Sequence, residues 1–295
     1  MIDRLIRKIE ETGNPSVAGL DPVYEMMPEN IKSEMLKSYG KTPKAVAEMF
    51  FAFNKGLIDS LCDIVPAVKP QIAMYEKYGL DGIRVYLDTI SYAKEKGLIV
   101  IGDIKRGDIS TTAEAYAAHI GGVSIEGEYF DLWKEDAVTL SPYMGFDAIE
   151  PFIKPCNELD KAIFILVKTS NPSSTELQDH EKAAEFVSKW GELAMGGNGY
   201  SKVGAVVGAT FKGQGERLRE LMPHTFFLVP GYGAQGGKGE DLKGFFGTDG
   251  RGCIVNSSRG IIAAYLKDAR YGGQNFGDAA REAALLMKDD IKGAL

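Results

Sequence analysis

The sequence is poor in cysteine and histidine, with three of each among 295 residues. Cys62, Cys156 and Cys253 are far apart and odd in number, so they lack the spacing of a disulfide framework, a zinc site or a redox motif. The three histidines are equally scattered and offer no metal-ligand spacing. We therefore expect reduced thiols, no metal and a cytoplasmic location.

Long apolar runs are also missing. No run approaches the roughly 20 residues that a membrane-spanning helix needs, and charge begins at Asp3 and Arg4, where a secretion signal would need an apolar core. The net charge of −7 argues against nucleic acid or an anionic membrane as a partner. A local cationic pocket for a small anionic ligand stays open.

Short apolar runs alternate with helical patterns along the whole chain. Ile2, Leu5, Ile6 and Ile9 form one stripe and predict a short N-terminal helix over residues 2–11. The predicted strands cover residues 16–20, 62–69, 98–105, 136–141, 162–168, 203–209, 226–230 and 253–257.

Eight strands alternating with helices indicate parallel strands and right-handed crossovers. They favour a closed barrel over an open doubly wound sheet. We therefore predict an α/β fold in one domain, residues 1–295: a single (β/α)8 TIM barrel with a short N-terminal helix. The segments 21–43 and 231–252 are unusually long, and both follow predicted strands on the face where barrel active sites lie.

The sharpest motif is Asp103-x-Lys105-x-x-Asp108, at the end of the third predicted strand. The strand period of two places Asp103 and Lys105 on one face, and Gly107 ends the strand before Asp108. An ordinary ion pair at a solvated strand end is the simpler interpretation. However, an ammonium held between carboxylates stays protonated, which suits a proton donor to a carbanion.

This motif and its surroundings, GDIKRGDISTTAEAYA, resemble the signature of orotidine 5′-monophosphate decarboxylases, in particular the longer bacterial branch. The resemblance extends over nearly the whole chain, because further strand-end motifs follow in order. It implies decarboxylation of orotidine 5′-monophosphate to UMP and CO2, the last step of de novo pyrimidine nucleotide biosynthesis. It also implies no cofactor, and a homodimer whose active sites are shared across the interface.

The resemblance carries roles for individual residues. Lys105 is implied as carbanion stabiliser and proton donor, with Asp103 beside the departing carboxylate. Lys69 ends the second strand in Val-Lys-Pro-Gln, where many relatives have an apolar residue and glycine after the lysine. The remaining implied roles are ribose binding by Asp21 and Lys69, contribution to the partner's site by Asp108 and Thr112, pyrimidine contact by Ser170, and phosphate binding by Pro230, Gln235 and Arg259.

Residues 231–236 also spell Gly-x-Gly-x-x-Gly, the dinucleotide-binding fingerprint. That fingerprint normally follows the first strand and opens a helix at once. Here it follows the seventh strand, and Gly237 and Gly239 delay any helix, which favours a phosphate loop of a barrel.

Two other functions stay open. Metal-dependent decarboxylases of the keto-gulonate-phosphate type share Asp-x-Lys-x-x-Asp, but they carry an acidic metal ligand where this chain has Lys69. A non-catalytic nucleotide-phosphate-binding barrel is the second alternative. Such a protein would be expected to lose Lys105 or its flanking aspartates, which this chain retains.

Overall fold

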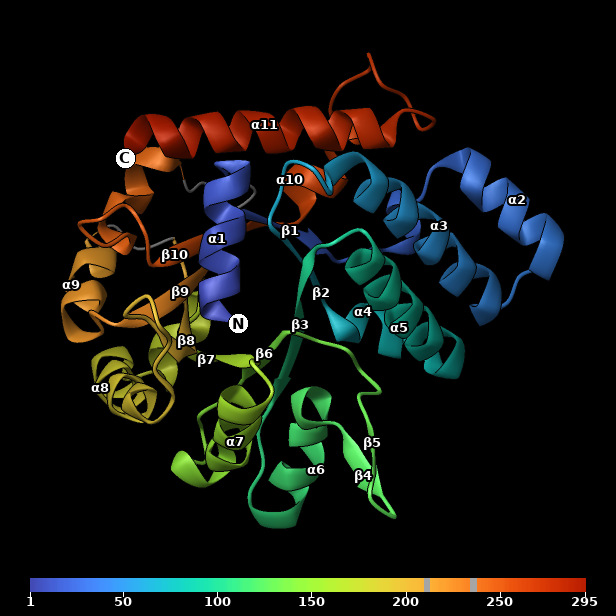
Figure 1. Cartoon of the computed structure of the whole chain (residues 1–295). Helices are drawn as coiled ribbons and strands as arrows, with labels where there is room; N and C mark the ends of the chain where they lie inside the picture. Colours follow the sequence, from blue (N-terminus) through green and yellow to red (C-terminus); the bar gives the residue numbers. More distant parts are fainter. Residues whose placement is uncertain (210–212, 234–237) are drawn as a thin grey trace.

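The computed structural model describes residues 1–209, 213–233 and 238–295. In these ranges, eight parallel strands close into a barrel with helices packed around it (Figure 1). Around the barrel the order is β1 (Ser16–Leu20), β2 (Ala67–Pro70), β3 (Ile99–Arg106), β6 (Ala137–Leu140), β7 (Ala162–Lys168), β8 (Ser201–Val207), β9 (Thr225–Pro230) and β10 (Cys253–Ser257). Because β1 pairs with both β2 and β10, the sheet has no free edge. The predicted TIM barrel is confirmed.

Helices follow the strands as the alternating pattern predicts. They are α1 (Ile2–Thr12), α2 (Glu29–Tyr39), α3 (Pro43–Leu61), α4 (Ile72–Glu76), α5 (Gly79–Glu95), α6 (Ser110–Gly121), α7 (Glu150–Glu158), α8 (His180–Gly191), α9 (Gln214–Leu221), α10 (Arg259–Ile262) and α11 (Phe276–Ala294). Thr42 begins α3, since its hydroxyl accepts the Ala45 N–H at 3.2 Å and Pro43 follows at the first helical position. Across the described residues, no helix combines the length and apolar character needed to span a membrane.

Several predicted boundaries and segments were wrong. The second strand begins at Ala67 and not at residue 62, because the helical turns of α3 continue until the Val65 N–H donates to the Leu61 carbonyl. The sixth predicted strand, 203–209, lies two residues earlier, at Ser201–Val207. An antiparallel hairpin of β4 (Val123–Ile125) and β5 (Glu128–Phe130) was missed.

The two long segments are partly helical. Residues 21–43 contain the 3-10 helix η1 (Tyr24–Met26) and then α2, and residues 231–252 contain η5 (Gly239–Phe245). Figure 1 shows α2 beside α3 at the edge of the molecule. The 21–43 segment is thus an additional helical layer on the barrel.

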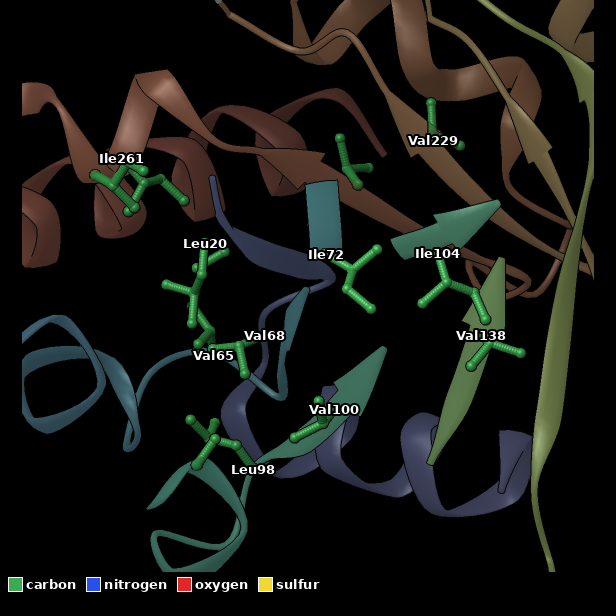
Figure 2. Close-up of a cluster of buried hydrophobic side chains, with 14 of the residues drawn as sticks. Leu20, Val65, Val68, Ile72, Leu98, Val100, Ile104, Val138, Val229 and Ile261 are labelled. Atoms are coloured by element: carbon green, nitrogen blue, oxygen red, sulfur yellow. The ribbon is translucent and has the colours of Figure 1, made fainter. Parts of the chain in front are cut away.

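The outward faces of the strands form the main hydrophobic core beneath the helices. Leu20, Val68, Val100, Val138 and Val229 come from five different strands and are all buried (Figure 2). Burying each such side chain contributes roughly 1.5–3 kcal/mol. This layer holds the helices to the barrel and sets the direction of the strands whose ends form the site.

The inward faces of the strands form a second core, which α1 closes at the N-terminal end of the barrel (called the lower end below). Ile2, Leu5 and Ile6 of α1 are buried against the barrel interior, as the amphipathic stripe predicts. The interior residues that they join include Val17, Ala67, Ile99, Ile101, Ala137, Phe164, Phe226 and Ile254. The barrel is therefore packed at its N-terminal end, and only its C-terminal end is available for a ligand.

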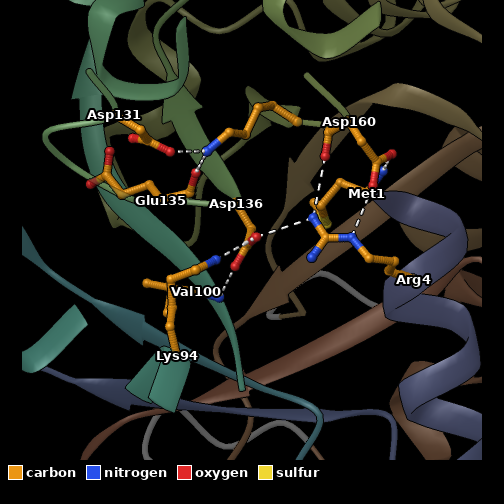
Figure 3. Close-up of polar contacts among 9 residues, drawn as sticks. Met1, Arg4, Lys94, Val100, Asp131, Glu135, Asp136 and Asp160 are labelled. Atoms are coloured by element: carbon orange, nitrogen blue, oxygen red, sulfur yellow. Dashed lines mark hydrogen bonds and ion pairs between the residues drawn. The ribbon is translucent and has the colours of Figure 1, made fainter. Parts of the chain in front are cut away.

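Charged residues around α1 pair at this lower end (Figure 3). The buried Asp136 carboxylate accepts bonds from Arg4 at 3.1 Å, Lys94 at 2.8 Å and the Val100 N–H at 2.9 Å. The Met1 amino group forms an ion pair with Asp160. Burial alone would raise the pKa of Asp136, but Lys94 and its other donors outweigh burial and lower it.

Candidate active site

The C-terminal ends of β2 and β3 carry a buried chain of alternating charges. Lys69 Nζ lies 2.6 Å from one Asp103 carboxylate oxygen, and Lys105 Nζ forms an ion pair with the other. Thr139 of β6 adds a hydroxyl bond to Asp103 at 2.8 Å. Asp103 and Lys69 are buried, whereas the Lys105 side chain is 43% exposed. One carboxylate is therefore shared by two ammonium groups, and one of these still faces the barrel mouth.

The charges in this array shift the pKa values of Asp103 and Lys69 in the direction of their ionised forms. Burial would raise the pKa of Asp103, but the charges of Lys69 and Lys105 outweigh it and hold that pKa well below its ordinary value. Burial would lower the pKa of Lys69, but Asp103 and then Asp21 raise it. Asp21 of the β1 end thus joins the array electrostatically, and its buried Oδ1 has no hydrogen-bond partner among the described residues.

Lys105 reaches this position through a distortion of β3. The register with β6 shifts between Gly102 and Arg106, and Lys105 has a positive φ of 47°. Its N–H donates to Thr139 Oγ1 at 3.1 Å. A non-glycine residue held in the left-handed region costs on the order of 1–3 kcal/mol, and such strain concentrates at functional sites. The strand period predicted the meeting of Asp103 and Lys105, but not this bulge.

A buried polar cluster packs against the outward face of β3, opposite to Asp103. The Glu135 carboxylate accepts a bond from Tyr86 and contacts His119 Nδ1 at 2.8 Å. An added Cβ at Gly102 would lie 2.1 Å from this carboxylate, so a larger residue directly before Asp103 would displace the Glu135 side chain. The position of Asp103 is therefore fixed from both faces of the strand.

Asp108 and Thr112 follow the charge array in the chain, on the loop after β3 and on α6. Asp108 is half-buried and accepts a bond from the Ile109 N–H at 2.8 Å, and Thr112 is exposed on the first turn of α6. Within the part of the chain that the structure describes, neither forms a hydrogen bond or ion pair with Lys105 or Asp103. Their role in a neighbouring subunit stays a prediction.

Three of the remaining predicted residues, Ser170, Pro230 and Arg259, lie at or just beyond the C-terminal ends of barrel strands. Ser170 follows β7 and lies against Gly208, where an added Cβ would come within 3.1 Å of the serine N atom. Pro230 ends β9, and its carbonyl accepts the Ala209 N–H at 2.9 Å. Arg259 is exposed at the start of α10. Gln235 lies outside the described residues.

Thr139 was not among the predicted site residues, although its position offered a signal. It is a polar residue at an inward position of a short, otherwise apolar strand. Metal ligands were not expected, and among residues 1–209, 213–233 and 238–295 no group of three or more His, Cys, Asp or Glu side chains could hold a metal ion.

Comparisons with known proteins point to one family. Residues 53–271 match the family described as Orotidine 5′-phosphate decarboxylase / HUMPS family. An orotidine 5′-phosphate decarboxylase of Caldicellulosiruptor saccharolyticus is 39% identical over 302 residues, covering 99% of this chain and 98% of the relative. The same-named protein of Clostridium tetani is 41% identical over 305 residues, covering 100% and 99%.

The solved structures agree. The OMP decarboxylase of Leishmania donovani matches this fold with a TM-score of 0.73 and 30% identity, over 99% of this chain and 97% of that one. Both the sequence and the barrel are thus similar to those of this family along their whole length.

Proposed function

The chain belongs to the orotidine 5′-phosphate decarboxylase family, and we propose that it converts orotidine 5′-monophosphate to UMP and CO2 in pyrimidine biosynthesis. The observation that carries the proposal is the Lys69–Asp103–Lys105 array at the barrel mouth. It supplies preorganised charge without a cofactor, which is what this reaction requires.

The reaction breaks the bond between C6 and its carboxylate. The electron pair stays on C6 in the plane of the ring, where no conjugated carbonyl can delocalise it. The Lys105 ammonium stabilises this charge and then transfers a proton to C6, and the lysine regains its proton from solvent. Asp103 lies beside the departing carboxylate and holds the Lys105 ammonium in place through their ion pair.

The other rim residues bind the parts of the nucleotide that do not react. Asp21 and Lys69 bind the ribose hydroxyls, Ser170 contacts the pyrimidine, and Pro230, Gln235 and Arg259 surround the phosphate. The loops after the seventh and eighth barrel strands are the usual phosphate site of this fold. Binding energy from the phosphate can then orient the ring over Lys105.

We propose that the enzyme is a homodimer in which Asp108 and Thr112 complete the partner's site. Support comes from exposed apolar residues on the loops that follow β3 and β6: Ile109 is 45% exposed, and Tyr143 is 81% exposed. Tyr143 follows β6, whose loop is held to the end of β3 by the bond from the Ser141 N–H to the Arg106 carbonyl at 2.8 Å. These neighbouring loops could bury their apolar side chains against a second copy.

We further propose that residues 1–295 act as one domain in the cytoplasm. The three cysteines are free, and Cys156 and Cys253 are buried. Burial raises the pKa of Cys156 to about 12. Buried thiols of this kind suit a reducing compartment.

The activity is tested by following the loss of orotate absorbance when the protein is incubated with orotidine 5′-monophosphate, with and without a chelator. We expect turnover that is insensitive to the chelator. Loss of turnover with the chelator would favour the metal-dependent keto-gulonate-phosphate type. Absence of turnover in both would contradict the proposed function.

A further inference from the structure

Asn256 is a buried polar residue inside the barrel that the proposed mechanism does not use. It belongs to β10, two residues beyond Ile254, which is part of the interior core. Because strand side chains alternate, Asn256 faces the interior as well. It is 7% exposed. It therefore lies one layer above the closed core, at the level where the site begins.

One end of the Asn256 amide is unpaired. Nδ2 donates to Ser258 Oγ at 3.3 Å, but the buried Oδ1 has no hydrogen-bond partner among the described residues. The great majority of buried side-chain polar atoms in folded proteins are paired. An unpaired carbonyl at the floor of a ligand site indicates a bond that forms only with the ligand.

The neighbouring strand is shaped to receive this amide. An added Cβ at Gly19 would lie 1.9 Å from Ser258 Oγ and 3.1 Å from Asn256 Oδ1. Gly19 therefore lets both side chains lie close against β1. Asp21 follows the end of β1, two residues beyond Gly19, and its Oδ1 is another buried acceptor without a partner among the described residues.

We infer that the Asn256 side-chain carbonyl accepts a hydrogen bond from a ribose hydroxyl of the bound nucleotide, next to Asp21. Two unpaired acceptors require donors, and a phosphate group offers acceptors. The pyrimidine N–H is a donor, but the proposed pyrimidine contact, Ser170, follows β7, three strands away from β10 around the barrel. The inference rests on the proposed function, since it names a further binding residue for the same substrate.

The test is a double-mutant cycle between the protein and the ligand. The dissociation constants of UMP, 2′-deoxy-UMP and 3′-deoxy-UMP are measured by calorimetry for the wild type and for Asn256→Ala. We expect one of the two deoxy analogues to bind the wild type about three- to tenfold more weakly than UMP does, as for one lost hydrogen bond. In Asn256→Ala the penalty for the same analogue should be clearly smaller than in the wild type, because Asp21 and Lys69 still contact the ribose.

Asn54→Ala is the matched control. Asn54 is also a buried asparagine with an unpaired Oδ1, but it lies on α3 and donates to Tyr75 and Thr89 outside the barrel. This variant should lose stability while keeping the wild-type ratio between UMP and its deoxy analogues. If Asn256→Ala does not fold, Asn256→Ser tests the same bond, because its hydroxyl is too short to replace the amide.

Equal discrimination against both deoxy analogues in the wild type and in the Asn256 variant would overturn the inference. The inference would also be overturned if Asn256→Ala weakened the binding of UMP but not that of uridine, which lacks the phosphate. The bond would then be to the phosphate. Turnover of orotidine 5′-monophosphate by the wild type is measured in parallel. If the wild type turns over substrate but Asn256→Ala leaves the penalty for the deoxy analogues unchanged, only the role of Asn256 is rejected. Absence of turnover would reject the proposed function.

Discussion

The N-terminal (lower) end and the C-terminal (upper) end of the barrel are built differently. At the lower end, the Asp136 carboxylate has three donors and α1 fills the interior with apolar side chains. At the upper end, Asp21 and Asn256 keep unpaired acceptors, and Lys105 has a strained backbone. The lower end is complete without a ligand, while the upper end contains strain and unsatisfied groups that a ligand could relieve. The comparison predicts that substitutions at the lower end reduce stability and that substitutions at the upper end reduce activity.

Lys105→Ala should have the largest effect on activity. Turnover should fall by at least about a hundredfold, within the 10²–10⁴ range of general acid catalysis, because no other ammonium faces C6 in the proposed mechanism. The melting temperature should stay near that of the wild type, since the side chain is 43% exposed. Absorbance assays and thermal unfolding measure the two quantities.

Lys94→Ala is the control at the opposite end, because Lys94 also pairs with a buried aspartate. It should lower the melting temperature and leave turnover unchanged. If Lys105→Ala kept more than about a hundredth of the activity, Lys105 would not be the proton donor.

Arg259→Ala should act through the phosphate alone. We expect kcat/KM for orotidine 5′-monophosphate to fall roughly 10- to 150-fold, as for loss of a hydrogen bond to a charged group. Turnover of orotidine, which lacks the phosphate, should hardly change. Equal losses with both substrates would place Arg259 elsewhere in the site.

Mixing two inactive variants tests whether the upper end is shared between subunits. Lys105→Ala and Asp108→Ala homodimers should each be defective at both sites. After subunit exchange, half of the dimers are mixed, and each of these has one intact site. An equal mixture should thus recover roughly a quarter of wild-type activity in a two-fold symmetric dimer. With exchange confirmed independently, recovery of nothing would mean that both residues serve the same subunit's site.

Asp136→Asn should affect stability and not turnover. The loss should be about 1–3 kcal/mol in the free energy of unfolding, as for weakened bonds to a buried group. The folded-state pKa of Asp136 is lowered, so its stabilisation is fully present above the unfolded pKa of about 3.9 and is lost as the pH falls through the lower folded value. Denaturant unfolding between pH 7 and 2.5 should show a shallower decline below pH 4 for the variant. An unchanged slope would contradict this role.

Much of the fold could be predicted from the sequence because each strand is a short apolar run followed by a helical pattern. The failures lie where tertiary context decides. Residues 62–65 read as apolar strand, yet Leu61 still accepts a helical bond from Val65, and Pro66 precedes the strand. The hairpin of β4 and β5 is short and mostly exposed, so it lacks the buried pattern on which the other strands were recognised.

For the site, the sequence predicted charges but not their geometry. The Asp103 and Lys105 pair follows from strand period and motif. The positive φ of Lys105 depends on the register with β6, which no local pattern encodes. Asn256 sits in an apolar strand, and only closure of the barrel shows that its amide packs against Gly19 of β1 and has an unpaired end.

The pairing of β1 with β10 has a consequence for synthesis on the ribosome. These strands are hydrogen-bonded neighbours (Figure 1), yet they belong to opposite ends of the chain. At about 5–20 residues per second, the intervening chain takes roughly 10–50 seconds to emerge. During that time the nascent sheet has an exposed edge at β1, a surface on which other unfinished chains can pair. The seam closes only when residues 253–257 have left the exit tunnel, so β1 lacks its β10 partner throughout that time.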